Sequence, residues 1–170
     1  EDYTGEGING FKEVYLRTMK RNNASSFYFF YDSFFSALIK QMKGHFCLFH
    51  QFNGNRQIAS VCVLLGHRSV YCYLMGNLEL SATLGAALQL QHHIIAWARE
   101  KGYSHYVLGG GLKKNDGIFA FKKAFAPGGI VPFYTGRRVF DQRRYETLVA
   151  VAREQRVAGP EGFFPAYRFQ

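Results

Sequence analysis

Three extended runs in the middle of the chain, with a long helical run behind them, restrict its fold more than any other feature. Residues 46–52 read as a strand, and Asn53-Gly54-Asn55 suits a tight hairpin turn, because Asn and Gly accept a positive φ. Residues 58–65 are nearly all apolar, which is typical of a strand covered on both faces. After a second turn, residues 70–75 complete an antiparallel meander of three strands.

Apolar residues with helical spacing surround this meander. They predict a first helix that begins after the N-cap Asn9 and a second that begins after the N-cap Asp32. A long helix over residues 82–101, capped by Ser81, follows the third strand and leads to a short strand over residues 103–108. This strand-helix-strand unit predicts one right-handed crossover between neighbouring strands.

The remaining sequence predicts a short helix over residues 118–125, a strand over residues 130–140 and a last helix capped by Asp141. Pro132 places that strand at an edge or a bulge. The order α-α-β-β-β-α-β-α-β-α predicts an α/β (α+β) fold with a mixed, mostly antiparallel central sheet flanked by helices. Because the chain has 170 residues and no internal repeat or linker, we expect a single domain over residues 1–170.

Charge and cysteine content narrow the range of functions. Lys and Arg number 21 against 12 Asp and Glu, and the net charge of +9 favours anionic partners such as phosphates, nucleotides or RNA. Cys47, Cys62 and Cys72 form no CxxC pair, so we expect buried thiols in a reducing compartment and a cytoplasmic location. No apolar run reaches the ~18 residues of a membrane span.

Two strand ends are candidate ligand sites, because open α/β sheets bind ligands beyond the carboxyl ends of their strands. Met75-Gly76-Asn77 is one end, and the crossover predicts that it lies beside the other, Gly109-Gly110-Gly111. Gly85 and Ala87, in the first turns of the long helix, would let a phosphate approach backbone N–H groups at the positive end of the helix dipole. Close packing of the helix on the sheet explains these small residues at least as well.

A basic segment follows the glycine turn. Lys113 and Lys114 follow it after Leu112 and are candidate phosphate ligands. Lys122 stands beside Phe121 on the predicted short helix, where its ammonium can hold a phosphate or a developing oxyanion, the alternative being a solvated lysine. Asp116 can serve as a base or as a helix N-cap, and we favour the cap. The histidines lack the spacing of metal ligands, so no metal is expected.

A family resemblance rests on residues 94–102, residues 106–110 and the run Asp116-Gly117-Ile118-Phe119-Ala120-Phe121-Lys122-Lys123-Ala124-Phe125. The chain resembles the second acetyltransferase-like (GNAT, acyl-CoA N-acyltransferase) domain of the FemAB family and the related BioF2-like proteins. The resemblance implies that two neighbouring strands, before and after the long central helix, splay apart to hold the acyl donor. It also implies a functional role near the reaction centre for Lys122, with Phe121 beside it.

The resemblance predicts an N-acyltransferase or aminoacyltransferase. The donor would be an acyl-CoA such as acetyl-CoA, or an aminoacyl-tRNA, and the acceptor an amine, for example on a peptidoglycan precursor. Ordinary GNAT enzymes bind the coenzyme A pyrophosphate with a Q/RxxGxG/A loop; Gly85 and Ala87 keep its end, but Ala82 stands where Gln or Arg belongs. FemAB enzymes carry two such domains, so we expect this chain to pair with an amino-terminal half or with a second copy.

Two other functions remain open. A catalytically inactive GNAT-like half that binds a partner or forms a dimer would explain Ala82 and the lack of a convincing general base. A basic RNA-binding module would explain the charge, with Tyr71, Tyr73 and Tyr134 available to stack on bases. The wide spread of the basic pairs along the chain argues against this third function.

Overall fold

The computed structural model describes residues 1–113, 115–155, 157 and 162–168. The chain forms two compact units, residues 1–127 and residues 128–170. The first unit holds the sheet and every predicted site residue.

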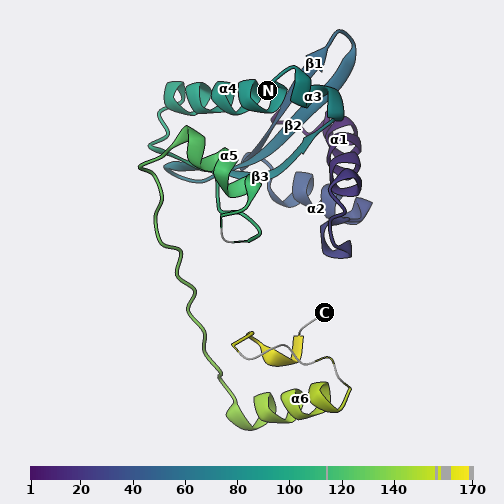
Figure 1. Ribbon diagram of the computed structural model, residues 1–170, viewed down its shortest axis with the longest axis vertical. Helices are drawn as coiled ribbons and strands as arrows, with labels where there is room; N and C mark the ends of the chain where they lie inside the picture. Colours follow the sequence, from purple (N-terminus) through teal and green to yellow (C-terminus); the bar gives the residue numbers. More distant parts are fainter. Residues whose placement is uncertain (114, 156, 158–161, 169–170) are drawn as a thin grey trace. The chain divides into compact units, whose positions relative to one another are not determined.

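A four-stranded mixed sheet forms the centre of the first unit (Figure 1). Its strands are β1 (Phe46–Asn53), β2 (Arg56–Leu65), β3 (Ser69–Asn77) and β4 (His105–Val107), in that order across the sheet. The first three are antiparallel neighbours, and β4 runs parallel to β3. Gly54 has a φ of +57° in the hairpin turn between β1 and β2. The predicted meander, crossover and α/β fold class are therefore confirmed.

The helices of the described residues are α1 (Ile8–Arg21), α2 (Asp32–Gln41), α3 (Glu79–Thr83), α4 (Ala86–Glu100) and α5 (Gly117–Phe125) in the first unit and α6 (Gln142–Glu154) in the second, with short 3-10 turns at Ser26–Tyr28 and Ala166–Arg168. Two predicted N-caps are wrong by one or two residues. Gly7 precedes α1 in place of Asn9, and Tyr31 precedes α2, so that Asp32 is its first residue. Figure 1 shows α4 apart from α1 and α2, across the sheet.

Each face of the sheet buries its own set of helices, because successive side chains of a strand point to opposite faces. Phe46 and Leu48 of β1 pack with α1 and α2, whereas Cys47 and Phe49 pack with α4. Two of the three thiols expected to be buried are so: burial raises the pKa of Cys47 to about 11 and that of Cys62 to about 12. Cys72 is only half-buried, so the expectation is wrong for this residue. The sheet thus separates two hydrophobic cores.

The predicted long helix over residues 82–101 is two helices. Gly85 has a φ of +62°, in the left-handed region, and this residue ends the short helix α3 and precedes α4. Ser81 lies inside α3 and caps nothing, so the predicted cap is also wrong. The break at Gly85 gives α4 an amino terminus of its own, which is part of the candidate site described below.

The predicted strand over residues 130–140 is absent from the second unit, where these residues form no ladder of hydrogen bonds. Val131, Phe133 and Phe140 are each more than three-quarters exposed. Apolar and β-branched residues favour a strand only where a neighbouring strand and a buried face accept them. The segment therefore has strand composition without strand structure.

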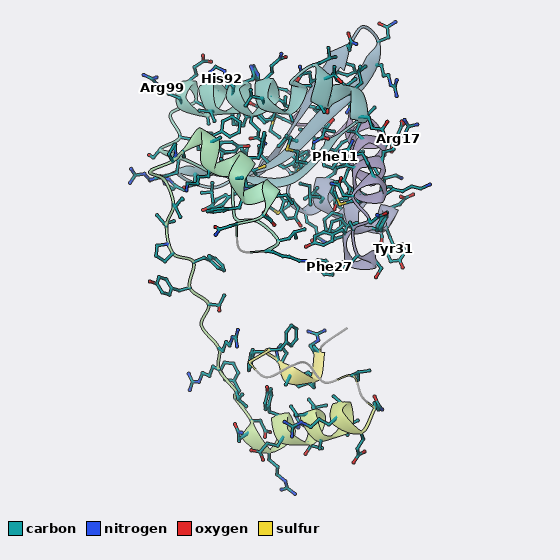
Figure 2. All side chains as sticks on the ribbon, viewed as in Figure 1. Phe11, Arg17, Phe27, Tyr31, His92 and Arg99 are labelled. Atoms are coloured by element: carbon teal, nitrogen blue, oxygen red, sulfur yellow. The ribbon has the colours of Figure 1, made fainter. Side chains whose placement is uncertain are left out.

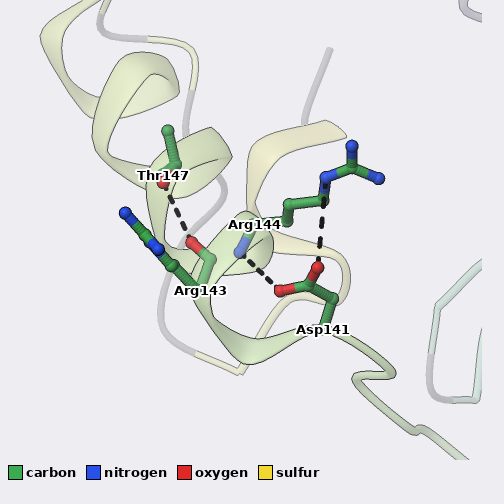
Figure 3. A network of polar contacts seen from close by, with 4 residues as sticks. All are labelled: Asp141, Arg143, Arg144 and Thr147. Atoms are coloured by element: carbon green, nitrogen blue, oxygen red, sulfur yellow. Dashed lines mark hydrogen bonds and ion pairs between the residues drawn. The ribbon is translucent and has the colours of Figure 1, made fainter.

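The last helix begins as predicted. Asp141 Oδ1 accepts the backbone N–H of Arg144 at 2.9 Å, and Thr147 Oγ1 donates to the Arg143 carbonyl at 2.9 Å (Figure 3). The Arg144 guanidinium lies 3.9 Å from the other Asp141 oxygen (Figure 3). The bond from Arg144 N–H to Asp141 is the helix N-cap, which satisfies one of the orphan donors of the first turn.

A buried polar group lies between α1 and the β1–β2 hairpin. His50 Nδ1 accepts the side-chain amide of Gln57 at 2.9 Å and lies 3.1 Å from Ser60 Oγ. Its proton is therefore on Nε2, which is buried without a hydrogen-bond partner. A Cβ on Gly7 would lie 2.4 Å from that nitrogen. Burial lowers the pKa of His50 below its ordinary value of 6.5, because the charged ring would lose its hydration.

This histidine predicts acid sensitivity. The unfolded chain takes up a proton near pH 6.5 and the folded chain only at lower pH, so the free energy of unfolding falls as the pH drops below 6.5. The loss is at most about 1.4 kcal/mol per pH unit. Urea unfolding at pH 7.5 and at pH 5.0 measures it. His50→Gln should reduce the difference, while His92→Gln, at an exposed position of α4 (Figure 2), should keep it; equal effects of the two variants would refute this role.

Candidate functional site

A gap opens between β3 and the chain that follows β4. The two strands pair only at Ser69↔His105, Val70↔Tyr106 and Tyr71↔Val107. β3 then continues to Asn77, whereas the chain after Val107 turns away through Gly109, whose φ is +72°. The predicted splay of the strands before and after the long central helix is therefore confirmed.

The backbone of Met75 faces this gap. Leu78 N–H bonds to the Ile58 carbonyl of β2, and Asn77 N–H bonds to Thr18 Oγ1 at 2.7 Å on the opposite side. Because N–H directions alternate along a strand, Met75 N–H points the same way as that of Asn77, away from β2. No strand of the described residues pairs with β3 at this position. Met75 thus offers a backbone donor to a ligand in the gap.

The other two residues of this strand end are held by α1. The Asn77 carbonyl accepts from Thr18 Oγ1 at 2.9 Å and from Arg21 at 2.7 Å, and a second Arg21 nitrogen lies 2.7 Å from Asn77 Oδ1. A Cβ on Gly76 would lie 2.6 Å from the backbone nitrogen of Tyr15. Sequence reasoning missed these contacts. Thr18 was detectable, since a hydroxyl on the apolar stripe of α1 needs a buried partner, but Arg21 gave no such signal.

The amino terminus of α4 can accept an anion. No side chain caps this helix, so the N–H groups of its first turn, from Ala86 through Ala87 to Leu88, are without a side-chain acceptor. Open space surrounds the position that a Cβ on Gly85 would take, while Ala86 is fully buried against the sheet. Helix dipole, free N–H groups and an unobstructed glycine suit a phosphate. The residues present therefore fit a pyrophosphate here, although Ala82 supplies no side-chain donor.

Lys122 reaches back from α5 to the glycine turn. Its Nζ donates to the Gly110 carbonyl at 2.7 Å and lies 3.7 Å from the position of a Cβ on Gly109. Phe121 packs edge-on against Phe125, with ring centroids 5.2 Å apart. The structure thus brings together Lys122 and the glycine turn, which lie twelve residues apart in the sequence.

Asp116 is the cap that we favoured and not a free base. Its carboxylate accepts N–H groups from Leu112 at 2.6 Å, from Lys113 at 2.8 Å and from Phe119 at 2.7 Å. These bonds, that from Lys113 first, lower the pKa of Asp116. The same carboxylate occupies the space that a Cβ on Gly111 would need. The Lys113 backbone belongs to this turn, and Lys114 lies outside the described residues.

The predicted site residues thus fall into three sets. Met75 lies beside the gap, and the amino terminus of α4, with Gly85 and Ala87, follows β3 in the chain. Lys122 contacts the glycine turn after β4, whereas Gly76 and Asn77 contact α1. No group of three or more His, Cys, Asp or Glu that could hold a metal occurs in the described part of the chain. Within the same residues, no helix is long and apolar enough to cross a membrane.

Comparison with solved structures shows the same fold in known acetyltransferases. An aminoglycoside acetyltransferase from an uncultured soil metagenomic sample superposes with a TM-score of 0.58 at 9% identity, over 81% of this chain and 95% of that one. A second such enzyme from soil, in complex with sisomicin, gives 0.56 at 16% identity, over 77% and 90%. The paia N-acetyltransferase of Thermoplasma acidophilum, in complex with coenzyme A, gives 0.51 at 11% identity, over 77% and 88%.

Sequence comparison gives a more specific result. No curated protein sequence matches this chain. The family model described as the acetyltransferase (GNAT) domain matches residues 4–123, from the segment before α1 into α5. That range contains the whole sheet, the amino terminus of α4, the glycine turn and Lys122. The chain therefore belongs to the GNAT acetyltransferase domain family.

Proposed function

We propose that this chain is an N-acyltransferase that uses an acyl-CoA, such as acetyl-CoA, as donor and an amine as acceptor. The observation that carries the proposal is the gap beside β3, where Met75 N–H is directed away from β2 at a position that β4 does not reach. GNAT membership and the uncapped amino terminus of α4 support it. The paia enzyme, of the same fold, is known in complex with coenzyme A.

Different residues would contact the donor and the acceptor. A bound acyl-CoA would supply a thioester carbonyl: the acceptor nitrogen would bond to its carbon, the carbon–sulfur bond would break, and the proton lost by the nitrogen would end on the leaving thiolate of coenzyme A. Met75 N–H would donate to the carbonyl oxygen, where negative charge grows in the transition state. The first turn of α4 would hold the pyrophosphate, and Gly109 and Gly110 would leave room for the acceptor. The ammonium of Lys122 would offset developing charge from the β4 side.

A second candidate is aminoacyl transfer of the FemAB type, from aminoacyl-tRNA to a cell-wall precursor. The contact of Lys122 with the Gly110 carbonyl favours it, because this lysine lies in the segment that resembles those enzymes. Parallel assays with acetyl-CoA and with charged tRNA separate the two donors. Turnover with neither donor, together with retained ligand binding, would favour the inactive binding module.

The donor site is tested by a charge placed at the amino terminus of α4. Leu88 is 55% exposed in the first turn, so a carboxylate there fits the fold and interacts favourably with the helix dipole. Leu88→Glu should keep or raise the unfolding free energy but weaken acetyl-CoA binding by roughly tenfold, since the carboxylate repels the pyrophosphate. Isothermal titration measures both variants, with Leu88→Gln as the uncharged control. Equal affinities of the two variants would place the pyrophosphate elsewhere.

A further inference from the structure

A cationic groove lies at the carboxyl end of β3. It is lined by Arg17, Lys20 and Arg21 of α1, by Arg56 of β2 and by Leu78 and Glu79 at the start of α3. None of these cations belongs to the predicted donor or acceptor residues. The groove cannot be recognised in the sequence. Three of its basic residues belong to α1 and the fourth to β2, and they meet only where α1 packs beside the β1–β2 hairpin.

The positive charge of the groove is largely unneutralised. Arg17 pairs with Glu13 at 3.1 Å, but Lys20, Arg21 and Arg56 form no ion pair with any described carboxylate. The dipole at the carboxyl end of α1 accounts for cations at Lys20 and Arg21. It does not account for Arg56, which a different element contributes. Glu13 pairs with Arg17 and Glu79 also lines the groove, so four basic residues less two carboxylates leave a surplus of two positive charges, whose mutual repulsion a bound anion would relieve.

One guanidinium is already fixed in place. Arg21 bonds to both the carbonyl and the side-chain oxygen of Asn77, each at 2.7 Å. A guanidinium held in this way loses little conformational entropy when its remaining N–H groups bind an anion. The carbons of Leu78, at the floor of the groove, are nearly fully buried. The site therefore combines one preorganised guanidinium with three further basic side chains beside a buried leucine.

The groove stands close to the proposed reaction centre. Arg21 contacts Asn77, and Met75 is two residues earlier on β3, about 7 Å along the strand. The groove belongs to the α1 side of the sheet, whereas α4 packs on the opposite face. A ligand group in the groove would thus be within reach of the gap and on the other face from the amino terminus of α4.

We infer that this groove binds a phosphate group carried by one of the two substrates of the proposed acyl transfer. A phosphate offers several strong acceptor oxygens to Arg and Lys together and carries up to two negative charges, which matches the surplus of the groove. The inference rests on the proposed function for the identity of the substrates. The presence of a phosphate site is independent of it.

Titration of the full chain with inorganic pyrophosphate tests the site. Thr18 and Arg21 hold Asn77 of β3, so the double variant Lys20→Gln/Arg56→Gln removes two cations of the groove and leaves those contacts in place. Lys40→Gln/Lys43→Gln removes the same charge from exposed positions at the end of α2. We expect the first pair to weaken binding by roughly tenfold and the second by less than about twofold. Equal losses in the two double variants, or no binding by the wild-type chain, would overturn the inference.

Titrations with acetyl-CoA and with 3′-dephospho-acetyl-CoA identify the substrate that carries the phosphate. If acetyl-CoA loses affinity in Lys20→Gln/Arg56→Gln while 3′-dephospho-acetyl-CoA does not, the 3′-phosphate of the donor occupies the groove. If pyrophosphate loses affinity and acetyl-CoA does not, the phosphate belongs to the acceptor. If pyrophosphate binds as expected but acetyl-CoA binds neither to the wild-type chain nor to the double variant, the phosphate site is supported and acetyl-CoA is ruled out as the donor.

Discussion

Gly76→Ala is expected to destabilise the first unit by about 3 kcal/mol or to prevent its folding. The new Cβ would lie 2.6 Å from the backbone nitrogen of Tyr15 and 2.8 Å from the carbonyl carbon of Val14, and a helix backbone cannot move aside as a flexible side chain can. Moving α1 away from β3 would also expose Phe11 and loosen the contacts of Thr18 with Asn77.

Gly110→Ala is the matched control for stability. Gly110 also lacks a positive φ, and no atom of the described residues lies within 4 Å of the position that its Cβ would take. Its substitution should change the free energy of unfolding by less than about 0.5 kcal/mol. Urea unfolding followed by circular dichroism measures both variants. A Gly76→Ala chain as stable as the Gly110→Ala chain would show that α1 does not pack on β3 as closely as described.

Lys122→Ala should lower turnover by roughly a hundredfold while the fold is kept. Lys122 is half-buried and donates a hydrogen bond to the Gly110 carbonyl, so its loss removes a cation beside the gap and frees the glycine turn. The release of free coenzyme A from acetyl-CoA in the presence of an amine acceptor gives the rate. Circular dichroism shows whether the helices remain.

Lys123→Ala is the control for this variant. Lys123 is the next residue of α5 and is exposed, so the substitution removes the same charge from the same helix. Its turnover should stay within about twofold of the wild type. Unchanged turnover in Lys122→Ala would show that Lys122 takes no part in the reaction. An equal loss in both variants would show that Lys122 contributes only through the total positive charge of α5.

The sheet could be predicted because its signals are local. The apolar run of β2 and the Asn-Gly hairpin turn each specify a strand or a turn without reference to distant residues. The splay was reached through the family resemblance, since the point where β3 and β4 part depends on the register Tyr71↔Val107, which no local pattern encodes. Local sequence patterns thus predicted the strands and the turn, and the family resemblance predicted that β3 and β4 splay apart.

Errors arose where tertiary contacts override local preference. Gly85 breaks the predicted long helix because its left-handed conformation is a property of the folded turn. The run over residues 130–140 has strand composition but no partner strand among the described residues of its unit. Gly76 was assigned to ligand approach, whereas the structure gives it a close contact with the α1 backbone. The cationic groove was missed because Arg56 meets α1 only in the folded chain.

The amide of Met75 tests the central proposal most directly. The chain contains three methionines, so a protein labelled with ¹⁵N at methionine gives three backbone amide signals, from Met19, Met42 and Met75. Acetyl-CoA should shift the Met75 signal strongly, because its N–H would donate to the acyl carbonyl, whereas coenzyme A without an acyl group should shift it much less. Met19 and Met42, in and after helices on the α1 side, should move little with either. A Met75 signal that stays in place at saturating acetyl-CoA would contradict acyl transfer in the gap beside β3.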